Sequence, residues 1–211
     1  MLADQFINVY ESTINDIDSD EVTTKKDEKI VGEYYSSATI LFSDFVGFTK
    51  KTEQLQPGEL IEILDSFFSG FDKIMDRFSI RKVKTIGDAY MAVGGIPDLN
   101  SNHAERTVLA AKEMINFVKG LNYQQQALGN EPWKIRIGIH TGPIIAGETS
   151  SQCDIWGDSV NIAARLESSG SEMEVHCSNE TNAYLPKAYT LSERKDVELK
   201  GKGSQNTFII K

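Results

Sequence analysis

Two aspartates occupy positions at which carboxylates could bind divalent cations. Asp44 follows a short apolar, partly β-branched run at residues 38–42, which predicts a buried strand that delivers the carboxylate at its end. Asp88 follows Gly87, a pair that predicts the tip of a β-hairpin. Carboxylates at two strand ends can hold paired cations, one activating a hydroxyl and the other neutralising phosphate charge. Each aspartate alone is more typical of a turn, so the assignment depends on the rest of the chain.

Asn161 and Arg165 are spaced to act on one ligand. They lie four residues apart in a segment that we predict to be a helix following Asp158, whose carboxylate would cap it. Residues four apart project from the same face of a helix. Taken alone, the same spacing would indicate a solvated polar face, and the Lys-Gly-Lys-Gly sequence at residues 200–203 would indicate a basic turn.

The elements that would position these side chains alternate between strand and helix patterns. Apolar side chains recur at helical spacing over residues 60–78, with Pro57 suited to the first turn, and we interpret this aromatic stripe as core. The runs at 80–86 and 90–93 are predicted to be the two strands of the hairpin. A second helix is predicted at 104–121, and further strands at 134–140, near 174–177 and at 207–210. This order predicts an α+β fold with helices covering one sheet.

Composition and charge fit one globular domain. The chain has 211 residues, of which 40% are hydrophobic and 25% charged. Acidic residues outnumber basic ones by 31 to 22, which argues against sequence-independent binding of nucleic acid. The only cysteines, Cys153 and Cys177, lack disulfide-framework or metal-ligand spacing and fit a reducing cytoplasm. No run approaches the roughly 20 apolar residues of a membrane helix, although a longer parent protein could be membrane-tethered.

The first 29 residues are predicted to be a connector that precedes the domain. Residues 16–29 carry many charges and almost no apolar side chains, which is typical of a solvated linker. Before them, four apolar side chains recur at helical spacing and could form a short amphipathic helix, although a frayed end fits equally: Phe6, Val9, Tyr10 and Ile14. We therefore expect the folded domain to span residues 30–211, downstream of a sensor or regulatory domain.

Five segments, in their order along the chain, carry a family resemblance. They are FSDFVGFT, TIGDAYMAVGG, GIHTGPIIAG, DIWGDSVNIAARLES and ELKGKG. Over residues 31–211 the chain resembles the catalytic domains of class III adenylate and guanylate cyclases. The resemblance implies a ferredoxin-like βααββαβ domain whose helices cover a mostly antiparallel sheet. It also implies a homodimer in which two protomers meet head to tail and share their active sites.

The resemblance assigns the metal site to Asp44 and Asp88, with the main-chain carbonyl of Phe45 helping. Together they would hold two divalent cations, Mg²⁺ or Mn²⁺, on one protomer. We expect the ribose 3′-hydroxyl to attack the α-phosphate in line, with pyrophosphate leaving. No side chain is assigned as the general base. We interpret His140 as a structural residue at a strand end, and the proton would pass to water or to a substrate phosphate.

The resemblance places the remaining catalytic groups on the other protomer. Asn161 would orient the ribose, and Arg165 would stabilise the charge that develops on the phosphorus oxygens and pyrophosphate. Lys200, the first lysine of the Lys-Gly-Lys-Gly sequence, would contact the phosphates. Its register against Lys202 stays open.

The choice of base is predicted from two positions that read the Watson–Crick edge in this family. Here they are Lys84, two residues before the Ile-Gly-Asp sequence, and Asp154, two residues before Trp156. Lysine has only donors and suits N1 of adenine, whereas an ionised aspartate accepts from the adenine amine. Guanylate cyclases typically carry Glu and a small residue such as Cys there. A shift of one residue would bring Cys153 to the second position, but Trp156 and Lys84 argue against it.

These observations predict an adenylate cyclase catalytic domain, which would convert ATP to 3′,5′-cyclic AMP. A guanylate or mixed-specificity cyclase is the nearest alternative. A regulatory domain that binds nucleotide without turnover is a second alternative, but such domains usually lose a metal carboxylate or the transition-state arginine. A nucleic-acid polymerase shares two-metal chemistry, and the acidity of the chain argues against it.

Overall fold

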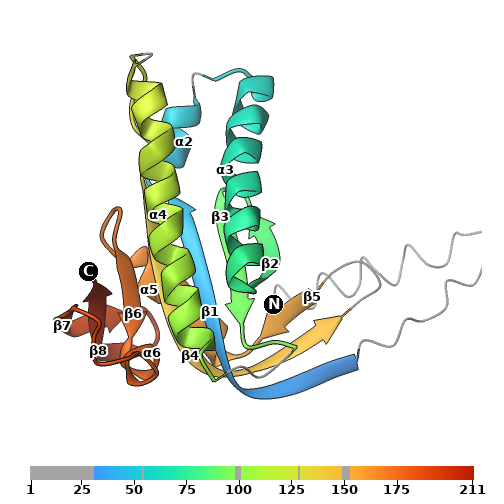
Figure 1. Cartoon of the computed structure of the whole chain (residues 1–211), viewed down its shortest axis with the longest axis vertical. Helices are drawn as coiled ribbons and strands as arrows, with labels where there is room; N and C mark the ends of the chain where they lie inside the picture. Colours follow the sequence, from blue (N-terminus) through green and yellow to red (C-terminus); the bar gives the residue numbers. More distant parts are fainter. Residues whose placement is uncertain (1–30, 54, 98–100, 128, 149–152) are drawn as a thin grey trace, which may run out of the picture.

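The computed structural model describes residues 31–53, 55–97, 101–127, 129–148 and 153–211. In this part the strands form one sheet in the order β2-β3-β1-β4-β6-β8-β7, with β5 paired to β4 (Figure 1). The strands are β1 (Val31–Phe45), β2 (Arg81–Ile86), β3 (Ala89–Gly94), β4 (Ile135–Glu148), β5 (Cys153–Trp156), β6 (Val175–Ser178), β7 (Leu191–Leu199) and β8 (Gly203–Ile210). The helices are α2 (Phe48–Thr52), α3 (Pro57–Phe78), α4 (His103–Ala127), α5 (Asp158–Ser168) and α6 (Asn179–Ala183).

The pairing pattern confirms the predicted α+β fold with a mostly antiparallel sheet. Among the described strands, β4 and β6 run parallel, and the other pairs are antiparallel. No helix in the described part of the chain has the length and apolar character needed to span a membrane. The predicted connector and its short helix lie outside the described residues.

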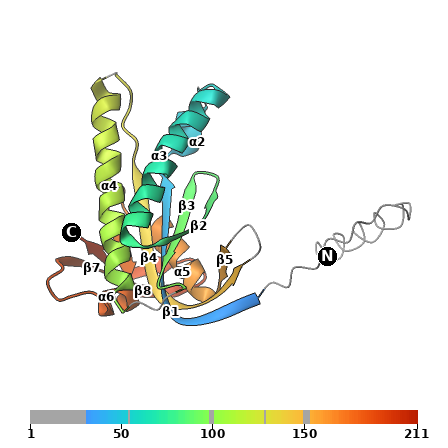
Figure 2. The ribbon, with the colours of Figure 1, turned by 45° about the vertical axis from the view of Figure 1, so that its right-hand side comes forward.

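Helices cover both faces of the sheet. In both views α3 and α4 stand side by side on one face (Figures 1 and 2), where Leu41 and Phe45 of β1 join their buried core. The alternate residue Ile40 lies in a second buried cluster that includes Ala163 of α5. Successive side chains of a strand point to opposite faces, so β1 serves both cores.

The hairpin and both long helices are confirmed, whereas several strands are longer than predicted. The first strand begins at Val31 rather than at residue 38, because its early part pairs with a continued β4, which in turn pairs with β5. These three segments form an arm that extends from the body of the sheet (Figure 1). The short elements α2, α6 and β5 were missed. So was β7, a charged strand at the sheet edge, where polar side chains mask the strand pattern.

Three local expectations are wrong. The stripe of α3 is not uniformly core: Phe67 and Phe71 are buried, but Ile61 is 67% exposed because it faces away from the sheet. Asp158 does not cap α5, since it lies in the first turn and Gly157 occupies the cap position without a side-chain bond. His140 lies inside β4 rather than at a strand end, because β4 continues to Glu148.

Gly138 of β4 lies where α5 crosses the sheet at close range. A Cβ atom at this position would clash with the main chain of Ala163 and of Glu167. The absence of a side chain at residue 138 therefore lets α5 approach the sheet.

We expect Gly138→Ala to lower the free energy of unfolding by about 1–3 kcal/mol, because α5 must move away from β4. Gly120→Ala is the matched control: a Cβ there meets nothing within 4 Å, so alanine should stabilise α4 by about 0.5–1 kcal/mol. Urea unfolding of both variants checks this. If the Gly138→Ala and Gly120→Ala variants were equally stable, the close packing of α5 on Gly138 would be contradicted.

Candidate active site

The structure brings Asp44 and Asp88 together. Asp44 lies near the end of β1, and Asp88 lies in the turn of the hairpin formed by β2 and β3, of which β3 pairs directly with β1. Burial, followed by the hydrogen bond and charge of the Asp88 carboxylate, raises the pKa of Asp44 to about 6. Two carboxyl groups this close resist simultaneous ionisation, so the pair carries negative charge that a cation would relieve.

Arg136 and Glu167 belong to the same cluster and were missed in the sequence. Arg136 is the β4 residue opposite Asp44, and its guanidinium lies 3.4 Å from an Asp44 oxygen and 2.8 Å from Oε1 of Glu167 on α5. Burial raises the pKa of Glu167, and Arg136 opposes that rise. In the sequence, Arg136 is a single charged residue between Ile135 and Ile137. Because side chains alternate along a strand, this pattern places the arginine on the face opposite the two isoleucines.

Lys84 and Asp154 form a second group. The Lys84 Nζ lies 2.6 Å from Oδ2 of Asp154, and the two side chains are 37% and 30% exposed. The other carboxylate oxygen of Asp154 accepts from the Ile155 N–H at 2.9 Å. A bulge at Val83 shifts the register of β2 so that Lys84 lies opposite Met91. This shift turns Lys84 to the α5 face of the sheet, because Met91 belongs to the buried cluster on that face.

The third group lies on α5 and the β7–β8 hairpin. Asn161 and Arg165 are both exposed on α5, and Lys200 is exposed in the turn of the hairpin. Lys202 is engaged elsewhere, in an ion pair with Asp158. Within the described residues, no hydrogen bond or ion pair links this third group to Asp44 or to Lys84. The contacts of the described residues thus divide the predicted site residues into three sets.

His140 has the surroundings of a structural residue. Its ring is 5% exposed, and Nδ1 lies 2.8 Å from the hydroxyl of Ser178. Burial lowers the pKa of His140, although Glu180 opposes the effect. The buried, hydrogen-bonded ring agrees with the interpretation of His140 as a structural residue.

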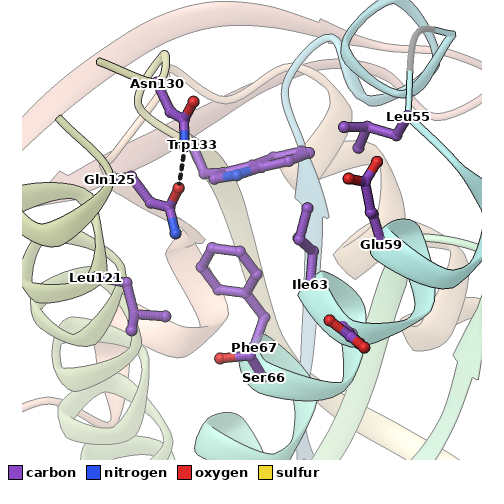
Figure 3. A pocket seen from close by; sticks show the side chains of 10 residues that line it. Leu55, Glu59, Ile63, Ser66, Phe67, Leu121, Gln125, Asn130 and Trp133 are labelled. Carbon is purple, nitrogen blue, oxygen red and sulfur yellow. Dashed lines mark hydrogen bonds between the residues drawn. The ribbon is translucent and has the colours of Figure 1, made fainter. Parts of the chain in front are cut away.

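A hollow of about 430 Å³ lies between the start of α3 and the end of α4 (Figure 3). None of the predicted site residues lines it. Two of its wall residues nevertheless support β1, the strand that carries Asp44, because the rings of Phe67 and Trp133 pack edge-on against Phe45 at 4.9 and 5.5 Å between centroids. The Phe45 side chain is therefore an anchor, and its main-chain carbonyl is the group left for a ligand.

The donor set at Asp44 and Asp88 fits Mg²⁺ or Mn²⁺. Carboxylate and carbonyl oxygens are the ligands these hard cations prefer, and Mg²⁺ commonly uses one or two carboxylates together with substrate phosphates. Burial is the largest cause of the raised pKa of Asp44 and the neighbouring Asp88 adds to it, so a cation bound there would favour the ionised carboxylate. The described part of the chain holds no group of three or more His, Cys, Asp or Glu side chains arranged to bind a metal ion.

Residues 30–211 match the family described as the adenylate and guanylate cyclase catalytic domain. The chain belongs to this family and is a class III nucleotide cyclase catalytic domain. Its fold and its ordered motifs agree with that membership.

The relatives include cyclases of both base preferences. An adenylate cyclase of Mycobacterium bovis is 34% identical over 187 residues, covering 87% of this chain and 41% of that protein. A receptor-type guanylate cyclase of Caenorhabditis elegans is 36% identical over 187 residues, covering 86% of this chain and 14% of the receptor. The chain thus spans less than half of these relatives, and identity alone does not select the base.

A solved structure shows the same fold. The catalytic core of a rhodopsin-guanylyl cyclase with converted specificity, in complex with ATPαS, superposes with a TM-score of 0.78 at 32% identity. The match covers 85% of this chain and 97% of that one.

We expect Asp44→Asn to stabilise the cation-free protein at pH 7 by about 1–2 kcal/mol. The folded-state pKa is raised from 3.8 to about 6, so the native state holds its proton more tightly than the unfolded chain. The wild-type protein should therefore lose stability relative to the variant as the pH rises from about 4 to 6, and the difference should then stay constant. Asp44 is 28% exposed and lies near Arg136, so we expect a smaller gain in stability than the full pKa shift would give.

Chemical unfolding of both proteins in EDTA between pH 4.5 and 8 measures this difference. Added Mn²⁺ should stabilise the wild-type protein and leave Asp44→Asn unchanged. Asp65→Asn, which removes an exposed carboxylate of α3, controls for net charge. A variant less stable than the wild-type protein at pH 7 without cation would contradict the charge crowding at Asp44.

Proposed function

We propose that this domain converts ATP to 3′,5′-cyclic AMP and pyrophosphate. The observation that carries the proposal is the pairing of Lys84 with Asp154 at 2.6 Å. The pair offers one donor and one acceptor side by side, which matches N1 and the amine of adenine. Guanine would meet donor with donor and acceptor with acceptor. In the substrate-free chain the two side chains satisfy each other, so an entering adenine exchanges one ion pair for two hydrogen bonds.

The proposed chemistry needs Asp44, Asp88 and the carbonyl of Phe45 to hold two divalent cations. Bound there, such cations lower the pKa of the ribose 3′-hydroxyl and neutralise triphosphate charge. The hydroxyl oxygen bonds to the α-phosphorus, the bond to pyrophosphate breaks, and the proton passes to water or to a substrate phosphate. His140 takes no part, because it is buried and already hydrogen bonded.

Three polar or charged side chains complete the proposed reaction. Asn161 orients the ribose, and Arg165 offers a planar fork to the oxygens that gain charge in the transition state. Lys200 binds the outer phosphates. The exposure of all three side chains supports this assignment, since a group that awaits a ligand must be accessible.

The proposal includes a homodimer with shared sites. No described hydrogen bond or ion pair links the three sets within one chain, and in the proposed dimer a partner supplies the set that faces Asp44. An exposed apolar row on the arm supports such an interface: Tyr34 lies opposite Ile145, and Ile145 lies opposite Trp156. These side chains are 67%, 48% and 47% exposed. Exposed apolar rows of this kind are typical of interaction surfaces.

Guanylate or mixed specificity is the second candidate, favoured by the 36% identity to a guanylate cyclase. The solved relative with converted specificity holds ATPαS, so base preference in that domain has been changed. Control by an upstream sensor belongs to the same proposal and is supported by the coverage of only 41% of the M. bovis enzyme. A cytoplasmic location also belongs to it and is supported by the free Cys153 and Cys177.

We expect purified protein with Mn²⁺ or Mg²⁺ to make cyclic AMP from ATP in preference to cyclic GMP from GTP. The double variant Lys84→Glu/Asp154→Cys should shift the ratio of the two kcat/KM values toward GTP by about 100-fold or more, because it reverses the donor and acceptor pattern. Separation of both products by HPLC measures the ratio. Equal turnover of ATP and GTP by the wild-type protein would contradict the assigned base choice.

Shared sites predict complementation between two inactive variants. Asp44→Ala lacks the metal carboxylate and Arg165→Ala lacks the phosphate fork, so each alone should be inactive. Their mixture should regain about one quarter of wild-type activity, because half of the dimers are mixed and each has one intact site. Adding Ile145→Asp to both chains is the control that should remove the recovery. No recovery under proven subunit exchange would count against shared sites.

A further inference from the structure

The β7–β8 hairpin contacts α5 at both ends of the helix. At the C-terminal end, Nη1 of Arg194 donates to the carbonyl of Ser169 at 3.1 Å. At the N-terminal end, Nζ of Lys202 pairs with the carboxylate of Asp158. The residues between these two contacts include Asn161 and Arg165. The hairpin and α5 thus form a clasp that is closed at two points.

The turn of the hairpin gives its two lysines different surroundings. The Lys202 N–H donates to the carbonyl of Leu199 at 2.7 Å, which closes the turn. Gly201 and Gly203 have φ of +76° and +72°, a conformation that favours glycine. Lys202 is 27% exposed in its ion pair with Asp158. Lys200 is exposed, and the structure gives its side chain no ion pair or hydrogen bond with any described residue.

The first turn of α5 is held from two sides. The hydroxyl of Ser159 donates to the carbonyl of Pro143 in β4 at 2.8 Å, which ties the turn to the sheet. Asp158 ties the same turn to the hairpin, and its negative charge is favourable at a helix N-terminus. An ion pair with a 63% exposed carboxylate adds little stability. Its loss should therefore leave the fold intact and free the hairpin turn to move against α5.

We propose that Lys202 and Asp158 are positioning residues that hold Lys200 in register with the active face of α5. The inference rests on the proposed function, in which Lys200 and Arg165 bind one triphosphate. It resolves the Lys-Gly-Lys-Gly sequence into two roles: Lys200 meets phosphate, and Lys202 fixes the turn that carries it. Since a displacement of about 1 Å can cost up to about 100-fold in rate, a weak but well-placed ion pair can matter for turnover.

The test compares Lys202→Gln, Asp158→Asn and their double variant with Lys202→Arg. We expect each single neutral variant to lower kcat/KM for the preferred nucleotide about 10-fold. The double variant should lose no more than either single one, because both remove the same contact. Lys202→Arg preserves the ion pair and should retain most activity. Arg77→Gln is the control, since it breaks the ion pair between Arg77 and Glu113, which links α3 to α4 on the opposite face of the sheet.

Hydrogen exchange on the same proteins provides a readout that needs no turnover. Lys202→Gln should speed exchange of the turn at residues 199–204 and of the first turn of α5, whereas Arg77→Gln should not. A wild-type protein without cyclase activity would refute the proposed function. The exchange data would still show whether Lys202 holds the hairpin turn against α5. Additive losses in the double variant, full activity of Lys202→Gln, or unchanged exchange would each overturn the positioning role.

Discussion

The double-sided pairing of β1 is the constraint on which the candidate site depends. This strand is hydrogen bonded to β3 on one edge and to β4 on the other, so neighbours on both edges determine its path. Leu41 and Phe45 are buried in the core formed with α3 and α4. The alternation of side chains then directs Asp44 to the α5 face. A slip by one residue would bury the carboxylate among aromatic rings, which makes the register strongly specified.

The electrostatics of the site follow from that placement. Asp44, Asp88 and Glu167 share one partly buried neighbourhood, and Arg136 is the cation that the described structure places between Asp44 and Glu167. Burial, followed by the hydrogen bond and charge of Asp88, raises the pKa of Asp44 despite the opposing charge of Arg136. Such a cluster lowers the stability of the cation-free fold. Destabilising arrangements of this kind are often found at functional sites.

The remaining candidate residues depend on different parts of the fold. Lys84 and Asp154 meet where the bulged strand β2 comes beside β5 of the arm, whereas Arg165 lies on α5, which packs against Gly138 and contacts the hairpin. In the proposed dimer, the exposed row on the arm would bring one set of site residues against another, and the two-point contact of the hairpin with α5 would position Lys200 relative to Arg165.

Local patterns in the sequence predicted most of the helices and strands, whereas the roles of the candidate site residues came from the resemblance to the cyclase family. The hairpin around Asp88 and the shared helix face of Asn161 and Arg165 follow from neighbours within a few residues, for which periodicity and turn chemistry are sufficient guides. The pairing of Lys84 with Asp154, 70 residues away, required the bulge at Val83.

The tertiary structure alone decided the contacts that join distant strands. Arg136 meets Asp44 across 92 residues of sequence, in a register set by the pairing of β1 with β4. No local pattern encodes a bulge or a cross-strand partner, because both are selected by how the two hydrophobic faces pack. The sequence therefore identified the chemical groups, and the packing of the sheet decided which of them share a site.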